Sequence, residues 1–250
     1  MLFIESPANP RFRFWKKELL GGGRREASLA LVCGRKVVDE FLRDFPGAVD
    51  SVLVRKGDDP PDLPKGFTGE VLVLAGFLFT EMDIFGTHYP MLVVKAEDPP
   101  MLGEQKKAPK GALLALTFQD PANLGAAVRT ALGMGVTAAL VMPGAASPLH
   151  AKAIRASSGA VFRLPMLRVA SESDLEGMTL LGLDSSGDDI RTFKFPTDFV
   201  LVPGVEGPGL SEDLRPEVLL SIPRAPVLES YPATTAVAMA LYEWRRGRKG

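Results

Sequence analysis

The regular alternation of apolar and helix-like segments after residue 111 most constrains what this chain can fold into. Short runs in this region are almost continuously apolar, and the segments between them have the spacing of helices. Strands that are apolar on both faces are typical of parallel sheets covered by helices. We therefore expect an α/β fold with a mostly parallel sheet and helices on both faces, with ligands bound beyond the carboxyl ends of the strands. The expected strands are 111–120, 137–144, 179–187, 198–204 and 217–223, and the expected helices are 121–135, 147–160 and 233–247.

The chain changes character at residues 99–110, which are rich in Pro, Lys and Glu and lack apolar periodicity. This composition is typical of a linker. We therefore expect a small α/β domain over 1–98 and a larger domain over 111–250. Within the small domain, the expected strands are 28–34, 49–57, 70–76 and 89–97, and an amphipathic helix is expected at 35–45.

The net charge of −1 does not by itself indicate a nucleic-acid-binding protein, but the charge is unevenly spread. Residues 1–36 carry eight Lys and Arg against three Glu, a net charge of +5. A local basic patch can bind phosphates even when the whole chain is near neutral. The segment RFRFWKK, residues 11–17, interleaves aromatic rings with cations, as single-strand RNA binders do. The same spacing fits an amphipathic helix with Phe12 and Trp15 packed inward equally well.

The single cysteine, Cys33, allows no intrachain disulfide, which is typical of a protein in a reducing cytosol. We interpret it as a buried, inert thiol. The apolar runs are too short to span a membrane, and the N-terminus lacks the pattern of a secretory signal. We therefore expect a cytoplasmic protein without membrane contact. His88 and His150 lie in different expected domains without other ligands at metal spacing, so we predict no metal site.

The stretch QDPANLGAAVRTALGMG, residues 119–135, places polar residues where an expected strand passes into an expected helix. Asp120 is suited to cap that helix. Asn123 and Arg129 fall outside its apolar stripe. Gly125 costs roughly 1 kcal/mol against alanine within a helix, which suggests close approach by another group. On this stretch alone, a surface arginine and a capping asparagine remain the simpler explanation.

Two further loops follow expected strands. The loop LVPGVEGPGLSEDL, 201–214, carries three glycines, whose backbone can approach a ligand closely. It matches neither the phosphate-loop nor the dinucleotide-binding pattern, and an ordinary tight turn would also explain it. The other loop follows Ile222 and carries Glu229, Ser230 and Tyr231 ahead of a helix that is apolar nearly all round. Such a helix is buried in a core or at a subunit interface.

Taken in order, these segments resemble the motifs of the SpoU/TrmH family, SPOUT-class RNA ribose 2′-O-methyltransferases that use S-adenosylmethionine. DPANLGAAVRTALGMGV is similar to the first motif, LVPGVEGPGLS to the second and IPRAPVLESYPATTAVAMALYE to the third, while KAIRASSGAVFRLP resembles the family's Arg-Ala-Ser-x-Gly segment. The resemblance spans residues 111–246. The N-terminal part resembles, more loosely, the RNA-binding domain that precedes the catalytic domain in many members.

The resemblance implies a trefoil-knotted SPOUT catalytic domain, a homodimer formed through the C-terminal domain, and methyl transfer from S-adenosylmethionine to a ribose 2′-hydroxyl of rRNA or tRNA without a metal. The implied catalytic residues are Asn123, Arg129, Glu206 and Ser230. The implied cofactor-binding residues are Pro203, Gly204, Gly207, Gly209, Ile222, Ser230 and Tyr231. The expected RNA-binding residues are Arg11, Arg13, Lys16, Arg24, Arg25 and Arg155.

Within this interpretation, Arg129 clamps phosphate and hydroxyl groups rather than acting as a base, because a guanidinium does not readily give up its proton. Glu206 would orient partners, and Ser230 would form a hydrogen bond near the reacting centre. Pro232 stands where the family has Asn, and proline supplies neither an amide side chain nor an N–H. A second hypothesis is therefore a non-catalytic or weakly active RNA-binding SPOUT protein. A third, a small-molecule-binding α/β enzyme, is disfavoured because the standard dinucleotide and phosphate-loop patterns are missing.

Overall fold

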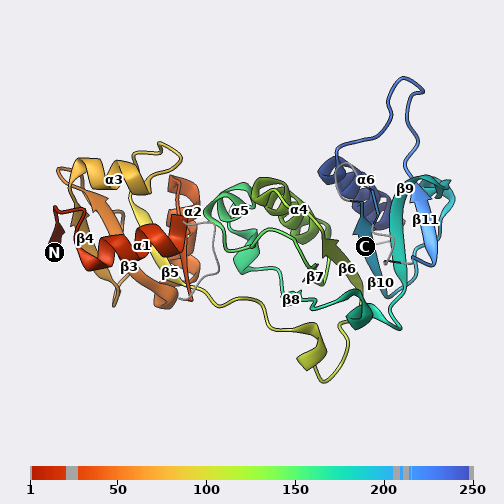
Figure 1. The fold of residues 1–250 in the computed structure, drawn as a ribbon, viewed down its shortest axis with the longest axis horizontal. Helices are drawn as coiled ribbons and strands as arrows, with labels where there is room; N and C mark the ends of the chain where they lie inside the picture. Colours follow the sequence, from red (N-terminus) through yellow and green to blue (C-terminus); the bar gives the residue numbers. More distant parts are fainter. Residues whose placement is uncertain (1, 21–27, 205–208, 211–213, 215, 248–250) are drawn as a thin grey trace. The chain divides into compact units, whose positions relative to one another are not determined.

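The computed structural model describes residues 2–20, 28–204, 209–210, 214 and 216–247. Backbone contacts divide the chain into two compact units (Figure 1). Unit 1 comprises Met1–Asp98 with Leu149–Gly159, and unit 2 comprises Pro99–Pro148 with Ala160–Gly250. The short segment Leu149–Gly159 is thus grouped with the N-terminal unit. The domain bounds expected from the sequence stay a prediction.

Unit 1 is a five-stranded mixed sheet with helices, in the order β1-β4-β3-β5-β2. β1, β4 and β3 run parallel to one another, and β5 is antiparallel to both β3 and β2. The strands are β1 (Leu2–Ile4), β2 (Leu29–Val32), β3 (Val49–Arg55), β4 (Glu70–Leu74) and β5 (Met91–Lys95). The helices are α1 (Pro10–Leu20), α2 (Arg35–Asp44), α3 (Gly76–Met82) and α5 (Ala151–Ala156), with a 3-10 turn η1 (Pro46–Ala48).

Helix α1 decides between the two interpretations of RFRFWKK. Phe12 and Trp15 are each only 1% exposed and belong to the core of unit 1. The side chain of Asn9 accepts hydrogen bonds from the backbone N–H groups of Arg11 and Phe12, at 2.9 and 3.3 Å, and so caps the helix. Phe12 and Trp15 are therefore core residues of an amphipathic helix and are not available for stacking on bases, whereas Phe14 is 42% exposed.

Cys33 lies in the same core, as expected. Burial, with a smaller contribution from the nearby charge of Asp83, raises the pKa of its thiol to about 12. The thiol is therefore protonated at neutral pH, which fits an inert cysteine.

Unit 2 is a six-stranded sheet in the order β11-β9-β10-β6-β7-β8, and all of its pairings are parallel. This confirms the α/β class with a parallel sheet. The strands are β6 (Ala112–Leu116), β7 (Ala138–Val141), β8 (Met166–Arg168), β9 (Leu180–Asp189), β10 (Phe199–Pro203) and β11 (Val218–Ser221). The helices are α4 (Pro121–Met134) and α6 (Ala233–Arg246), with 3-10 turns η2 (Leu102–Glu104), η3 (Ala160–Phe162), η4 (Glu172–Leu175) and η5 (Ile190–Thr192).

The two faces of this sheet pack against different parts of the chain, because side chains alternate along each strand. On one face, α4 and α6 contact each other, and the Phe199 ring meets the Trp244 ring edge-on at 5.9 Å. The opposite face forms a core with the segments that carry η2 and η4, through Leu102 and Leu175. The trefoil knot implied by the family resemblance stays a prediction.

The expected helix over 147–160 is mostly wrong. Only the six residues of α5 are helical, because Ser158 and Gly159 take left-handed φ angles of 52° and 76° and end the helix. The sequence also missed β1, α3 and β8, which are short elements of three to seven residues.

Candidate functional site

The three candidate loops lie at one edge of the unit 2 sheet. β6, β10, β9 and β11 are neighbours in that order and all run parallel, so their carboxyl ends share an edge. α4 follows β6, the glycine loop follows β10, and the Ile222 loop follows β11. A fourth segment, in the middle of β9, lies between the last two and was not recognised as part of the site from the sequence.

The start of α4 is fixed by Asp120, as the sequence predicted. The Asp120 carboxylate accepts hydrogen bonds from the backbone N–H groups of Ala122 and Asn123, at 2.7 and 3.0 Å. Pro121 occupies the first position of the helix, where a missing N–H costs nothing. This cap holds the turn that carries Asn123 against the end of β6.

The two candidate catalytic residues of α4 differ in their surroundings. Asn123 is half-buried, whereas Arg129 is exposed and, among the residues that the structure describes, forms no ion pair or hydrogen bond. Gly125 is buried on the inner side of the helix. Arg129 lies eight residues beyond Pro121, roughly 12 Å along the helix axis. Its cationic group is thus available to an external anion.

Gly204 and Gly209, at the two described ends of the glycine loop, lie close together after β10. Pro203 is buried, and its carbonyl accepts a hydrogen bond from the Thr117 hydroxyl at 3.2 Å, which links the ends of β10 and β6. A Cβ added to Gly204 would lie 3.1 Å from the carbonyl carbon of Gly209, and Gly209 itself has a left-handed φ of 80°. Both glycines are therefore required by the turn. Glu206 and Gly207, also predicted site residues, lie outside the described residues.

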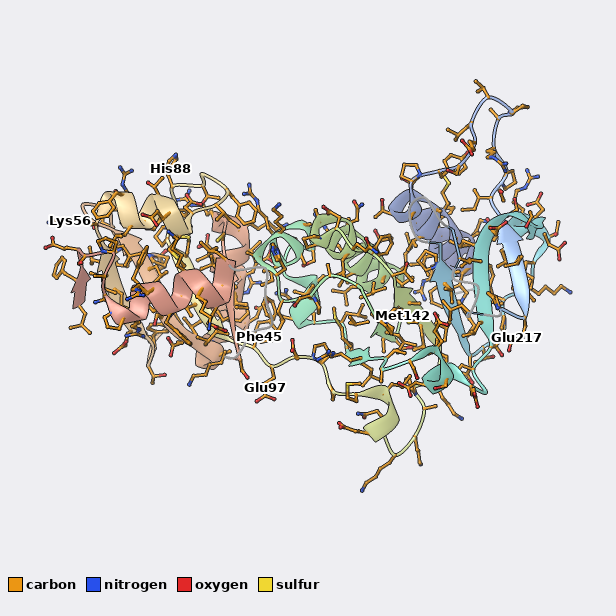
Figure 2. All side chains as sticks on the ribbon, in the orientation of Figure 1. Phe45, Lys56, His88, Glu97, Met142 and Glu217 are labelled. Atoms are coloured by element: carbon orange, nitrogen blue, oxygen red, sulfur yellow. The ribbon has the colours of Figure 1, made fainter. Side chains whose placement is uncertain are left out.

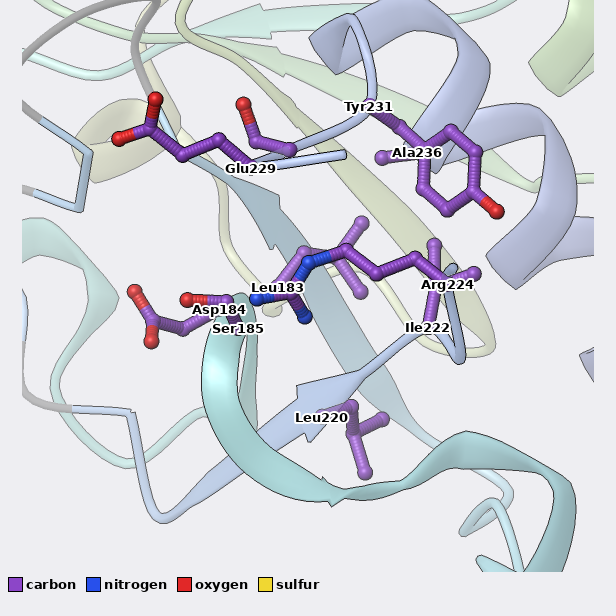
Figure 3. Close-up of a pocket in the computed structure, with 10 residues that line it drawn as sticks. Leu183, Asp184, Ser185, Leu220, Ile222, Arg224, Glu229, Tyr231 and Ala236 are labelled. Atoms are coloured by element: carbon purple, nitrogen blue, oxygen red, sulfur yellow. The ribbon is translucent and has the colours of Figure 1, made fainter. Parts of the chain in front are cut away.

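A pocket opens where the middle of β9 and the end of β11 meet the start of α6 (Figure 3). It brings together three of the predicted cofactor-binding residues, Ile222, Ser230 and Tyr231. The chain between β11 and α6 projects away from the sheet above it (Figure 1). The full lining is Leu183, Asp184, Ser185, Leu220, Ile222, Arg224, Glu229, Ser230, Tyr231 and Ala236.

The middle of β9 lines one side of this pocket with Leu183, Asp184 and Ser185. Asp184 accepts hydrogen bonds from the hydroxyl and the backbone N–H of Ser186, at 2.7 and 2.8 Å, and these bonds lower the pKa of its carboxyl. A Cβ on Gly187 would lie only 2.4 Å from the backbone of Leu219, so β9 and β11 approach closely beside the pocket.

The loop between β11 and α6 is held by its own hydrogen bonds. The Tyr231 hydroxyl donates to the Pro223 carbonyl at 3.2 Å, and Arg224 Nε donates to the Leu228 carbonyl at 3.0 Å. Pro232 occupies the N-cap position of α6, with no side-chain hydrogen bond to the helix. The Asn-to-Pro departure therefore falls on the residue that joins the pocket loop to α6.

The candidate RNA-binding residues of unit 1 are not equivalent. The Arg11 guanidinium contacts Glu70, Asp50 and Ser51 and lies over the Trp15 ring at 4.9 Å from its centroid. Lys16 pairs with Glu81 at 2.7 Å.

Arg13, by contrast, is exposed and has no ion pair within the described part of the chain. Arg155 lies over the Phe85 ring at 4.4 Å. Arg24 and Arg25 lie outside the described residues.

The two histidines have separate surroundings. His88 is exposed on unit 1 (Figure 2), and His150 caps α5 by accepting a hydrogen bond at Nδ1 from the Lys152 N–H, at 3.1 Å. Among the residues with described positions, no group of three or more His, Cys, Asp or Glu could hold a metal ion. None of the described helices combines the length and the apolar character that crossing a bilayer requires.

Several known proteins are similar to this chain in sequence and in fold. The chain is 37% identical over 246 residues to Ribosomal RNA small subunit methyltransferase G 2 of Syntrophobacter fumaroxidans, in a match that covers 97% of this chain and 49% of the relative. This chain thus spans about half the length of that relative. It is 28% identical to the 23S rRNA (guanosine(2553)-2′-O)-methyltransferase RlmP of Bacillus subtilis, over 97% of this chain and 98% of the relative.

The crystal structure of the SpoU methyltransferase AviRb from Streptomyces viridochromogenes, in complex with the cofactor AdoMet, is similar with a TM-score of 0.76. It is 25% identical, and the match covers 96% of this chain and 98% of that one. The SpoU rRNA Methylase family matches residues 112–242, which is more than half of the chain and contains all three candidate loops. The chain belongs to the SpoU rRNA Methylase family.

Proposed function

We propose that this protein transfers a methyl group from S-adenosylmethionine (AdoMet) to a ribose 2′-hydroxyl of rRNA or tRNA. The observation that carries the proposal is the pocket at the carboxyl edge of the parallel sheet, which gathers Ile222, Ser230 and Tyr231. Ligands bind at this edge in open parallel sheets. The relatives named above act on RNA, and AviRb binds AdoMet, which supports the same chemistry here.

The lining of the pocket fits AdoMet. Apolar side chains from β9, β11 and α6 suit the adenosine, and the polar side chains of the lining suit the amino-acid end. Pro203, Gly204, Gly207 and Gly209 would complete the binding loop with backbone groups. When bound, the cofactor supplies an electrophilic methyl group on its sulfonium sulfur.

On the RNA side, Arg129 and Asn123 are proposed to position the ribose. The exposed, unpaired Arg129 would hold a phosphate and stabilise negative charge on the 2′-oxygen as its proton leaves to a phosphate or water. Asn123, Glu206 and Ser230 would orient the groups around the reacting oxygen by hydrogen bonds. Arg129 keeps its own proton throughout, because a guanidinium is too weak an acid to serve as the base.

Apolar side chains exposed on α6 support the proposed homodimer. On α6, Met239 is 38% exposed and Tyr242 is 60% exposed, whereas Val237 is buried. A dimer formed through this face would bury them. We expect Tyr242→Glu to shift the sedimentation coefficient toward that of a monomer, whereas Tyr231→Phe, outside the face, should leave it unchanged.

Unit 1 is proposed to bind the RNA substrate, with Arg13, Arg24, Arg25 and Arg155 as candidate contacts and Arg11 and Lys16 already paired to acidic groups. We propose that the enzyme acts in the cytoplasm, where rRNA and tRNA are found in bacteria.

The test is transfer of a tritiated methyl group from AdoMet to unmodified bulk RNA, followed by mapping of 2′-O-methyl sites in rRNA and tRNA with and without this protein. A single site that disappears without the protein would support the proposal. AdoMet binding without transfer to any RNA would instead favour the second hypothesis, a SPOUT protein inactivated by Pro232.

A further inference from the structure

Arg224 stands out among the residues of the pocket because it is the only lysine or arginine in the described lining. Its side chain extends across the pocket and points its guanidinium toward the middle of β9, where Leu183 and Asp184 lie (Figure 3). It lies within the stretch that resembles the family's third motif, but it was not among the predicted site residues. Its position follows from the pairing of β11 with β9, which brings two distant segments together.

The loop holds Arg224 by one nitrogen only. Nε donates to the Leu228 carbonyl at 3.0 Å, and the Leu228 N–H donates to the Ala225 carbonyl, which closes the turn. Asp184 and Glu229 line the same pocket, but among the described residues neither forms an ion pair with Arg224. The two terminal nitrogens of the guanidinium are thus directed into the pocket and available to a ligand.

The charges of the pocket complement those of AdoMet. AdoMet carries one anion, the carboxylate, and two cations, the ammonium and the sulfonium. The pocket carries one cation, Arg224, and two carboxylates, Asp184 and Glu229. Asp184 stays ionised because Ser186 holds its charged form. A guanidinium binds a carboxylate through two parallel hydrogen bonds, which makes it the natural partner for the only anionic group of the ligand.

We propose that Arg224 binds the carboxylate of the methionine moiety of AdoMet, while Asp184 and Glu229 offset the ammonium and the sulfonium. This inference rests on the proposed function, since it presumes that AdoMet occupies this pocket. The other anion that could reach Arg224 is an RNA phosphate. The apolar walls formed by Leu183 and Ile222 suit a nucleoside and a hydrocarbon chain better than a hydrated phosphate.

The test compares AdoMet with decarboxylated AdoMet, which keeps both cations and lacks only the carboxylate. Calorimetry measures each dissociation constant for the wild type, for Arg224→Gln and for Arg245→Gln, a control that removes an exposed cation of α6 outside the pocket. Arg224 is exposed, so we use the lower end of the range for the contribution of a hydrogen bond to a charged group. This contribution corresponds to about a tenfold loss of affinity. We expect Arg224→Gln to bind AdoMet about tenfold more weakly and decarboxylated AdoMet unchanged, with Arg245→Gln like the wild type.

Three results would overturn the inference. The first is an Arg224→Gln variant that still prefers AdoMet over the decarboxylated compound as strongly as the wild type. The second is equal weakening of both ligands, which would mean that the substitution damages the pocket as a whole. The third is unchanged AdoMet affinity with weaker RNA binding, which would assign Arg224 to a phosphate. Wild-type protein that binds neither compound would instead contradict the proposed function itself.

Discussion

Gly187 is the position where one added methyl group tests the architecture of the pocket most directly. In Gly187→Ala, the new Cβ would lie 2.4 Å from the carbonyl carbon and oxygen of Leu219 and 2.6 Å from the nitrogen of Leu220. Ordinary contacts begin at 3.4 Å, so β9 and β11 must separate by about 1 Å. All of the opposing atoms are backbone, and no rotamer change relieves the overlap.

The expected loss of stability is about 3 kcal/mol, the upper end for overpacking a tight site. It falls where the register between β9 and β11 already shifts, between Leu219 and Leu220. Because Leu220 and Ile222 line the pocket, separation of these strands should also weaken AdoMet binding. For a unit of this size, we expect the melting temperature of unit 2 to fall by roughly 6–12 °C.

The two tryptophans of the chain allow the units to be followed separately. Trp15 is buried in unit 1 and Trp244 in unit 2. In a Trp15→Phe background, the fluorescence of Trp244 reports the unfolding of unit 2 alone. The matched control is Gly133→Ala, on the exposed side of α4, where an added Cβ meets no atom within 4 Å. This control should stabilise unit 2 by up to about 1 kcal/mol.

The reasoning would be refuted by a Gly187→Ala protein that melts like the wild type and binds AdoMet with unchanged affinity. That outcome would mean that the close approach of β11 to β9 does not shape the pocket. If Gly133→Ala destabilised unit 2 as much as Gly187→Ala does, the loss of stability could not be attributed to the separation of β9 and β11.

Three further predictions concern other parts of the chain. Asp120→Ala should cost unit 2 about 1 kcal/mol, read from Trp244 fluorescence in urea, and Asp120→Asn should restore most of it because asparagine also caps helices. Arg129→Ala should lower methyl transfer about 10- to 100-fold while AdoMet affinity in calorimetry stays unchanged, and equal loss of both would contradict its placement on the RNA side. The stability of unit 1 should fall as pH rises from 9.0 toward about 12, because the unfolded chain releases the Cys33 proton that the folded chain keeps. In Cys33→Ala, the urea midpoint of unit 1 should depend less on pH across that range than it does in the wild type.

The sequence predicts the elements of unit 2 well where the pattern is local. The strands from β6 to β11 were expected except for β8, and α4 and α6 begin and end close to the expected residues. α5 was predicted too long, because its apolar spacing continues past the point where Ser158 adopts a left-handed backbone. The interpretation of residues 11–17 could not be decided either, since inward packing and base stacking require the same alternation of rings and cations.

The candidate site divides in the same way. The loops after β6, β10 and β11 carry polar residues or glycines at strand ends, which is a local signal. The contribution of Asp184 carries no such signal, because it depends on β9 lying between β10 and β11 in the sheet. Arg224 belongs to the loop after β11, but it shares a pocket with Asp184 only because β11 pairs with β9. Strand order is a nonlocal property, so the local sequence around Asp184 does not reveal that this residue lines a pocket.

The arginines show why residue type alone does not identify a ligand contact. Arg11 belongs to the most basic part of the sequence, yet β3 and β4 place Asp50 and Glu70 beside it, so its charge is already used within unit 1. Arg129 and Arg224 sit in a unit where the fold brings no carboxylate into an ion pair with either among the described residues. A cation left without an internal partner keeps its full attraction for an external anion, whereas a paired one must first give up its partner. For this chain, the acidic residues therefore decide which basic residues can serve the RNA and the cofactor.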